Sequence, residues 1–298
     1  MAKVLVFGGR GWVGQALVSV LTRAGHEVAA PRSEVCDVAD ARDVDRVFAH
    51  TQPAAVVNAA AINPGAGDEA RMRAVNAEAA RHVAVASARC GARLVHVSTD
   101  VVLDGRSAPY RDDAKAAPLN AYGRTKADGE AAVLAACPSA VAVRTSLVYD
   151  PAAPDASTRG FIEKLRTGEP CRLFTDEIRC PIARPALAAA LTELIELDVA
   201  GTLNVAGAEA LSRHEFGKLL LDWFKVPRRR NVEAARAADL AEPRPLDLTL
   251  DVSKARSLLA TPLRGVRETL CADEGWGIRG GKVARLARRP NRGAPRSR

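Results

Sequence analysis

The sequence lacks the features that mark membrane-spanning, disulfide-rich and metal-binding proteins. In its 298 residues, no hydrophobic run approaches the roughly 18 residues of a membrane-spanning helix. The six cysteines include no C-x-x-C pair, and their spacing fits neither a zinc site nor a small disulfide framework. The N-terminus also lacks the charged, apolar and cleavage regions of a signal peptide. We therefore expect a cytoplasmic protein with reduced thiols, no metal and no membrane span.

Acidic residues are missing from the C-terminal segment 277–298, which contains eight basic residues. That charge equals the net charge of +8 of the whole chain, so residues 1–276 are neutral overall. The segment is rich in Gly, Pro and Arg and has no apolar periodicity, a composition typical of disordered chain. We expect a disordered, solubilising tail and no specific nucleic-acid partner.

Hydrophobic residues form 48% of the chain and follow alternating strand and helix patterns. Strands are predicted at 3–7, 26–30, 54–61, 92–99 and 140–146, and helices at 12–25, 40–50, 68–90 and 121–137. Strands separated by helices of this length pair in parallel through right-handed crossovers. The pattern predicts a doubly wound parallel α/β sheet within residues 1–150.

The alternation becomes less regular after residue 150. Helices are predicted near 157–167, 185–197 and 212–224, and a strand at 202–207. Ser212 and Glu215 have the spacing of a capping box. We expect residues 151–276 to form mainly a smaller substrate-binding lobe, with segments near 185–207 returning to the first domain.

The stretch "FGGRGWVG" (7–14) places Gly8, Gly11 and Gly14 between a strand and a helix. Glycine permits the positive φ of a tight turn and lets the backbone approach a pyrophosphate. The helix that follows, beginning at Trp12 and Val13, presents unpaired N–H groups to the phosphates. This context predicts the dinucleotide-binding loop of a Rossmann-type fold.

Two arginines favour NADPH as the dinucleotide. NAD-binding proteins usually place an acidic residue after the second strand, where it holds the ribose 2′-OH. Here the first polar residue after that strand is Arg32, and Arg10 lies within the glycine-rich loop. Guanidinium groups suit a 2′-phosphate, whereas a carboxylate repels it. Glu34 follows closely, so NAD stays a possible cofactor.

Tyr122 and Lys126 are four residues apart on a predicted helix and so share one face. A tyrosine has an unperturbed pKa of about 10, and we expect the nearby ammonium group to lower that pKa towards a catalytic range. Upstream, Ser98, Thr99 and Asp100 end a predicted strand, at the edge where parallel sheets bind ligands. A hydroxyl there can hold a substrate carbonyl.

The motifs resemble those of the extended short-chain dehydrogenase/reductases, and most closely the dTDP-4-dehydrorhamnose reductase group. The resemblance covers about residues 3–260 and rests on "GGRGWVG", "VVNAAA", "VSTDVVLDG", "PLNAYGRTKADGE", "RTSLVYD" and "RPLDLTLDVSK". It implies a catalytic triad of Thr99, Tyr122 and Lys126, with Asp100 as an acid beside the hydroxyl. Tyr122 would protonate the alkoxide, and Lys126 would hold the nicotinamide ribose.

The same resemblance implies further binding residues. Asp37 matches an aspartate that contacts the adenine, and the other expected cofactor contacts are Val38, Asn58, Ala59 and Ala60. Expected substrate contacts are Thr99, Asp100, Val101, Arg144 and Ser146. Arg144 and Arg184 are candidates for binding a diphosphate, because guanidinium groups match phosphate geometry.

The combined prediction is an NADPH-dependent reductase of the 4-keto group of a nucleotide-activated deoxysugar, with dTDP as the expected nucleotide. Related dehydratases carry Asp-Glu after the threonine, and Val101 after Asp100 argues against that activity. An epimerase with tightly bound NAD and a non-catalytic NADP-binding regulatory subunit are the alternatives. The expected partner is a nucleotide-sugar, and a homodimer is a possible assembly.

Overall fold

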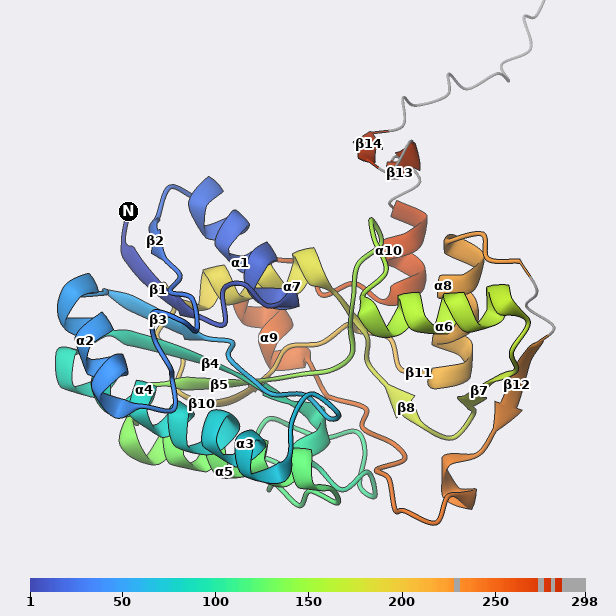
Figure 1. Cartoon of the computed structure of the whole chain (residues 1–298), viewed down its shortest axis with the longest axis horizontal. Helices are drawn as coiled ribbons and strands as arrows, with labels where there is room; N and C mark the ends of the chain where they lie inside the picture. The colour runs from blue at the N-terminus through green and yellow to red at the C-terminus, as the bar shows by residue number, and fades with distance from the viewer. Residues whose placement is uncertain (228–230, 273–275, 280–281, 286–298) are drawn as a thin grey trace, which may run out of the picture.

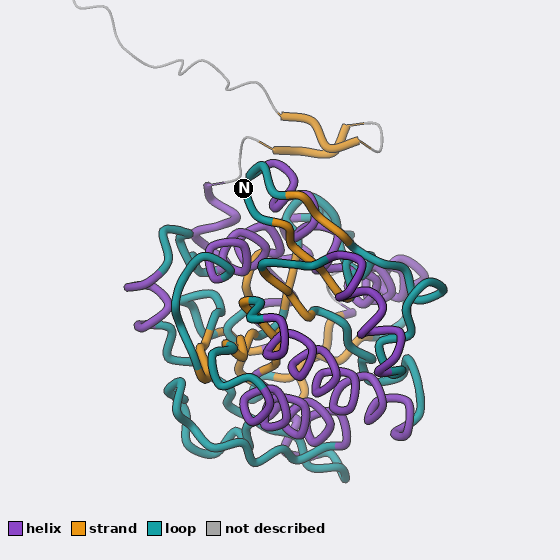
Figure 2. The backbone as a smooth tube through the Cα atoms, turned by 90° about the vertical axis from the view of Figure 1, so that its left-hand side faces the viewer, coloured by secondary structure: helices purple, strands orange, loops and turns teal. Residues whose placement is uncertain are grey.

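The computed structural model describes residues 1–227, 231–272, 276–279 and 282–285. It contains a six-stranded sheet with helices on both faces, and a smaller lobe beside it (Figure 1). Figure 2 shows the strands enclosed between the helices in a view along a second direction. Within the described ranges, no helix has both the length and the apolar composition needed to cross a bilayer.

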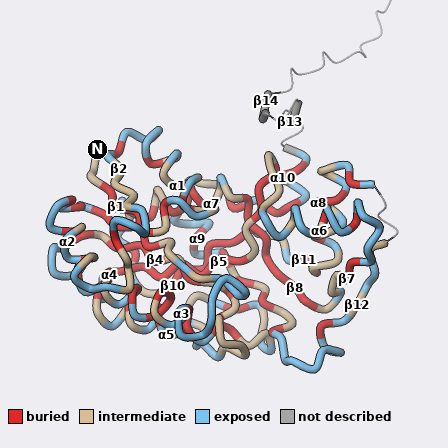
Figure 3. Tube along the Cα trace, in the orientation of Figure 1, coloured by how far each residue is buried: buried red, intermediate tan, exposed pale blue. Residues whose placement is uncertain are grey.

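The central sheet is parallel throughout, which confirms the predicted fold class. Its order is β10-β5-β4-β3-β1-β2, and every neighbouring pair runs in parallel. The strands are β1 (Lys3–Phe7), β2 (Glu27–Ala29), β3 (Ala55–Asn58), β4 (Arg93–Thr99), β5 (Val141–Thr145) and β10 (Gly201–Asn204). Strands covered on both faces are apolar in every position rather than alternating, and β3 and β5 are buried at every residue (Figure 3).

Two separate cores lie on the two faces of the sheet, because successive strand residues point to opposite sides. Val4 and Val6 of β1 belong to the first core, whereas Leu5 and Phe7 belong to the second. The first core includes residues of α1 (Trp12–Arg23), α7 (Arg184–Leu194) and α9 (Ser253–Leu258). The second includes residues of α2 (Ala41–Thr51), α4 (Ala79–Cys90) and α5 (Ala121–Ala136).

The helix predicted over 68–90 is interrupted. It consists of α3 (Glu69–Arg73), a π-helical turn η1 (Ala74–Glu78) and α4. Asn76 in this turn is fully buried, accepts from the Ile62 amide at 2.9 Å and donates to the Thr125 hydroxyl at 3.1 Å. Helix α5 packs against the turn so closely that a Cβ on Gly129 would lie 2.0 Å from the Asn76 carbonyl oxygen. Such single π turns are frequent at functional sites.

The second lobe is built from short elements. Its helices are α6 (Ala156–Thr167), α8 (Arg213–Trp223) and α10 (Val266–Ala272), and its strand pairs are β7 (Cys171–Phe174) with β12 (Val232–Ala235), and β8 (Ile178–Arg179) with β11 (Leu211–Ser212). The predicted capping box of Ser212 and Glu215 opens α8, which confirms that prediction. The pair β6 (Val148–Tyr149) and β9 (Ile182–Ala183) lies where the chain leaves and rejoins the sheet.

The chain returns to the first domain more often than predicted. Segment 184–204 does so through α7 and β10, as expected from the sequence. In addition, Leu248, Ala255 and Leu263 join the first core, so part of the segment assigned to the second lobe packs on the sheet.

Part of the segment predicted to be disordered forms a hairpin. Strands β13 (Trp276–Arg279) and β14 (Lys282–Arg285) pair in an antiparallel arrangement. Residues 286–298 of the predicted tail lie outside the described ranges.

Replacing Gly129 by alanine is expected to destabilise the protein, because the new Cβ would lie 2.0 Å from a backbone oxygen. The required shift costs roughly 1–3 kcal/mol. Gly160→Ala on α6 is the matched control, since a Cβ there meets nothing within 4 Å and alanine stabilises an exposed helix by up to about 1 kcal/mol. Urea unfolding curves measure both changes, and equal effects would contradict the close contact.

Candidate active site

The glycine-rich loop forms a tight turn that ends at the N-terminus of α1. Gly8 has φ of 74°, and its carbonyl accepts from the Gly11 amide at 2.9 Å. A Cβ on Gly14 would lie 2.0 Å from that same carbonyl oxygen, so only glycine allows this turn. Helix α1 begins without a side-chain cap and without an acidic residue in its first turn. Its first N–H groups and its positive end therefore fit an anionic pyrophosphate.

The residues expected around the adenosine lie at the ends of β1, β2 and β3. Arg10 and Arg32 are exposed, and neither guanidinium forms a hydrogen bond or ion pair with the described residues, so both are available to a phosphate. Asp37 accepts from the Ala39 amide at 3.1 Å and lies 3.7 Å from Arg71. Asn58 at the end of β3 is buried.

The remaining predicted cofactor contacts stand close by. Asn58 accepts from the amide of Ala60 at 3.2 Å, and the amide of Ala59 donates to the Phe7 carbonyl at 3.0 Å. Val13 packs half-buried against the first core, while Val38 and Ala60 pack against the second.

Thr99 and Tyr122 meet at the carboxyl end of β4. Thr99 is the last residue of that strand, and its hydroxyl donates to Asp100 at 3.2 Å. Tyr122 lies in the first turn of α5, which is capped by the Asn120 side chain accepting from the Gly123 amide at 2.8 Å. The Thr99 hydroxyl lies close enough to the Tyr122 phenol to lower its pKa. The structure thus brings two members of the predicted triad near each other.

The pKa of the Tyr122 phenol is raised to about 12: burial is the largest cause, the nearby carboxylate of Asp100 adds to it, and the Thr99 hydroxyl partly offsets both. Lys126 is not among the causes of this shift, so the expectation that its ammonium group lowers the tyrosine pKa stays a prediction. The phenol is therefore neutral at pH 7. A neutral phenol is a proton donor, which is the form that reduction of a carbonyl requires.

Lys126 follows one turn later on α5 and is buried. Its ammonium group donates to the Val97 carbonyl at 2.7 Å, which holds it beneath the end of β4. Burial lowers the pKa of Lys126 to about 8, and the Glu130 carboxylate partly offsets that effect. The lysine reaches the same edge as Thr99, as the four-residue spacing from Tyr122 predicts.

Arg144 is committed to a buried ion pair. Its Nε donates to Glu130 at 3.1 Å, and its Nη1 donates to the Ala114 carbonyl at 2.6 Å. Glu130 also accepts from the Ser98 hydroxyl at 2.9 Å. With its guanidinium 3% exposed, Arg144 ties β5 to α5, and this arrangement does not support the expectation that it contacts a substrate diphosphate.

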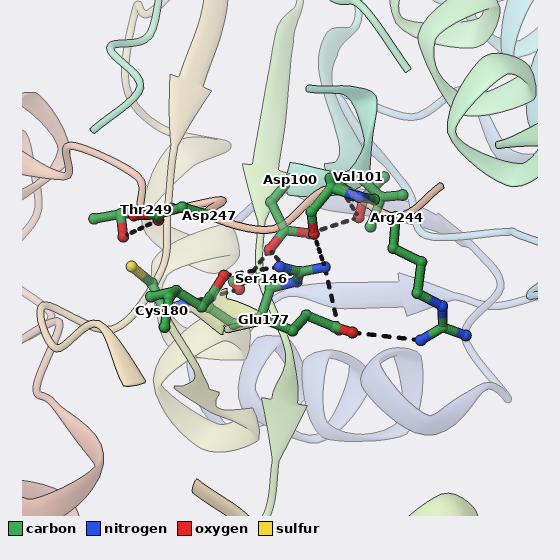
Figure 4. A network of polar contacts seen from close by, with 12 residues as sticks. Asp100, Val101, Ser146, Glu177, Cys180, Arg244, Asp247 and Thr249 are labelled. Atoms are coloured by element: carbon green, nitrogen blue, oxygen red, sulfur yellow. Dashed lines mark hydrogen bonds and ion pairs between the residues drawn. The ribbon is translucent and has the colours of Figure 1, made fainter. Parts of the chain in front are cut away.

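Asp100 connects the triad to the second lobe (Figure 4). It accepts from the Ser146 hydroxyl at 2.6 Å and lies 3.8 Å from the guanidinium of Arg179. Arg179 in turn contacts Glu177 at 3.2 Å, and Glu177 contacts Arg244 at 3.3 Å. Burial raises the pKa of Asp100, while Arg179 lowers it.

Sequence reasoning missed Glu177 and Arg179, because the stretch "FTDEIRCP" matches no motif and its neighbours in space are remote in sequence. Arg244 lies in "RPLDLTLDVSK", one of the motifs on which the family resemblance rests. That resemblance was the one sequence signal that Arg244 could belong to the site. Val101, expected to touch the substrate, packs half-buried against the first core.

Trp12 and Arg184 join the glycine-rich loop to Asp150, where the chain leaves the sheet. The Arg184 guanidinium lies 4.0 Å above the centre of the Trp12 ring and donates to the Trp12 carbonyl at 3.3 Å. It also forms an ion pair of 2.5 Å with Asp150, whose side chain is 3% exposed. Arg184 is thus engaged on three sides, which does not support its proposed contact with a diphosphate.

The chain combines a parallel α/β sheet, a dinucleotide loop and a Thr–Tyr–Lys set at one sheet edge. The family model described as the RmlD substrate binding domain matches residues 2–272, so the chain belongs to that family. dTDP-4-dehydrorhamnose reductase of Mycolicibacterium smegmatis is 32% identical over 276 residues, covering 90% of this chain and 84% of that protein.

Two further similarities extend this result. Methionine adenosyltransferase 2 subunit beta of Pongo abelii is 29% identical over 303 residues, covering 90% of this chain and 87% of that protein. The crystal structure of dTDP-4-dehydrorhamnose reductase from Bacillus anthracis in complex with NADP superposes with a TM-score of 0.82 and 24% identity, over 91% of this chain and 98% of that one. This superposition confirms the fold.

Arg184→Met is expected to lower the free energy of unfolding by about 3 kcal/mol, because it leaves the buried Asp150 carboxylate without its cation. The double variant Arg184→Met/Asp150→Asn should recover part of that loss. Arg159→Met removes an exposed guanidinium that, among the residues the structure describes, binds only the Pro154 carbonyl, and should change stability by less than about 0.5 kcal/mol. Urea unfolding checks all three, and a loss no larger than in the control would refute the role of the pair.

Proposed function

We propose that this chain is an NADPH-dependent reductase of the 4-keto group of a nucleotide-activated deoxysugar, with dTDP as the nucleotide. The observation that carries the proposal is the half-buried Tyr122 phenol in the first turn of α5, near Thr99 and Asp100 at the end of β4, where its raised pKa keeps it neutral. Relatives at 32% identity are named dTDP-4-dehydrorhamnose reductase, and the family match spans almost the whole described chain.

The proposed roles follow from the positions of the three side chains. A bound nicotinamide supplies a hydride to the carbonyl carbon. The carbonyl oxygen takes the place next to Thr99 and Tyr122, where the threonine hydroxyl donates a hydrogen bond and the phenol gives up its proton. Reduction thus converts the ketone to an alcohol, with one hydride from NADPH and one proton from Tyr122. Lys126, held at Val97, is placed to bind the nicotinamide ribose.

The cofactor is proposed to lie along the edge formed by the glycine-rich loop and the ends of β2 and β3. The N-terminus of α1 would hold the pyrophosphate, and Asp37 would face the adenine. Arg10 and Arg32 would bind the 2′-phosphate, which favours NADPH over NADH. A solved neighbour from Bacillus anthracis carries NADP.

The two alternatives are less well supported. An epimerase with bound NAD would not need two free arginines at the ribose, and a non-catalytic subunit would not need the intact Thr99, Tyr122 and Lys126. The proposal includes a cytoplasmic location, no specific nucleic-acid partner and a homodimer as the candidate assembly.

Tyr122→Phe is expected to lower the rate of keto-sugar reduction by about 10²-fold or more, because the proton donor is lost, while NADPH affinity stays within a few-fold of wild type. Turnover is followed by the loss of NADPH absorbance with dTDP-, UDP- and GDP-4-keto sugars, and affinity by calorimetry. A wild-type protein that binds NADPH and reduces none of these sugars would instead establish the non-catalytic subunit.

The double variant Arg10→Ala/Arg32→Ala is expected to weaken NADPH binding by about tenfold or more and NADH binding far less, because only NADPH carries the 2′-phosphate. Arg256→Ala is the matched control, an exposed arginine of α9. Dissociation constants for both dinucleotides decide the question, and equal losses for NADPH and NADH would exclude the assignment.

A further inference from the structure

His96 is a buried polar side chain that the rest of the described chain leaves unpaired. It lies on β4 and is 1% exposed, and neither of its ring nitrogens forms a hydrogen bond with the described residues. A neutral imidazole carries one N–H donor and one acceptor nitrogen. Burying such groups unpaired costs free energy, so native proteins almost always give them a partner, either from the chain or as an ordered water.

The imidazole of His96 points to the side of the sheet that α5 covers. Alternate residues of a strand face the same side, and the hydroxyl of Ser98, two residues later, donates to Glu130 of α5 at 2.9 Å. Lys126 precedes Glu130 by one helical turn and so lies on the same face of α5. Its ammonium group donates at 2.7 Å to the carbonyl of Val97, the residue that follows His96. His96 and Lys126 therefore face each other between the strand and the helix.

The other polar groups of this buried layer have partners. Lys126 and Glu130 of α5 and Arg144 of β5 are its charged groups, and Glu130 pairs with Arg144. Strand β3 contributes the uncharged Asn58, which is the register partner of His96, whereas α4 contributes apolar side chains. An ammonium group has further N–H donors besides the one that Lys126 gives to the strand. His96 is thus an unpaired acceptor beside a lysine with N–H groups to donate.

The charge states of the two groups suit a hydrogen bond from lysine to histidine. Burial, and after it the charge of Lys126, hold the pKa of His96 well below its usual range, so the imidazole is neutral at pH 7 and can accept. Burial lowers the pKa of Lys126 to about 8, and Glu130 partly offsets that effect. A neutral acceptor stabilises the ammonium form and keeps the lysine charged at neutral pH.

We propose that His96 is a positioning residue for Lys126, which accepts a hydrogen bond from the lysine ammonium through one buried water, an inference that rests on the proposed function. The ring of His96, the ammonium of Lys126 and the amide of Asn58 offer this water three polar groups, and a buried water typically makes about three hydrogen bonds. The water would keep the ammonium charged and hold it at the edge where the nicotinamide ribose is proposed to bind. His96 acts through Lys126 and does not touch the substrate.

The direct test is the titration of Lys126 in the full chain without NADPH, followed by NMR of protein labelled with ¹³C-lysine and assigned with Lys126→Arg. His96→Leu is expected to lower the Lys126 titration midpoint by about one pH unit, because the buried ammonium loses its acceptor. His96→Asn, which keeps a donor and an acceptor, should lower the midpoint by less.

Turnover gives the second measurement. The charged lysine is the form proposed to hold the cofactor, so kcat/KM for keto-sugar reduction should fall as the pH rises through the pKa of Lys126. In His96→Leu this alkaline limb should move to lower pH by the same amount as the NMR midpoint. Leu94→Ala is the matched control, because Leu94 lies on the same strand face within the second core. It should lower the urea midpoint and leave the pH profile in place.

Three results overturn the role of His96: an unchanged Lys126 titration in His96→Leu, an equal shift in Leu94→Ala, or a crystal structure that resolves buried waters and shows none between His96 and Lys126. The two proposals fail separately. A shifted Lys126 titration in a protein that reduces no keto-sugar supports the His96 contact and rejects the reductase. Active enzyme whose pH profile is the same in His96→Leu keeps the reductase and rejects the contact.

Discussion

Close contact of backbone with backbone is the constraint on which the site depends. The turn between β1 and α1 exists only because Gly14 leaves room for the Gly8 carbonyl oxygen, 2.0 Å from where a Cβ would stand. On the opposite side of the sheet, a Cβ on Gly123 would lie 2.4 Å from the Val101 carbonyl oxygen. That contact seats the first turn of α5 against the end of β4 and sets Tyr122 beside Thr99. The two helices that carry the proposed chemistry, α1 and α5, can take these positions because Gly14 and Gly123 have no side chain.

The buried charged residues of the site determine its electrostatics and the pKa values of its catalytic groups. Lys126, Glu130 and Arg144 lie together behind the strand end with almost no exposure, and each carries a compensating contact, as buried ions require. Burial, together with the nearby carboxylate of Asp100, keeps the pKa of Tyr122 high. The result is a tyrosine that retains its proton at neutral pH, next to a lysine that is occupied with the Val97 carbonyl.

Local patterns in the sequence predicted the fold well, because each buried strand and each amphipathic helix shows a characteristic spacing of apolar residues within its own short segment. The glycine-rich loop, the Tyr122–Lys126 spacing and the strand end at Thr99 were predictable for the same reason. The pairing of Arg144 with Glu130 was not, since it depends on how β5 meets α5. Arg179 contacts residues far apart in sequence, such as Asp100 and Pro245, and no period or spacing in the sequence predicts those contacts. The π turn at Asn76 lies where the chain packs against α5. The apolar periodicity of residues 68–90 does not reveal that contact.

The stacking of Arg184 on Trp12 connects two parts of the chain that are far apart in sequence. Asp150 marks the point where the chain leaves the sheet for the second lobe, and the guanidinium that it holds rests on the indole of the glycine-rich loop. Arg184 itself opens α7, which packs with α1 in the first core. One guanidinium thus ties the start of α1 to the place where the chain departs for the second lobe, so the dinucleotide loop and that exit point are held in fixed register.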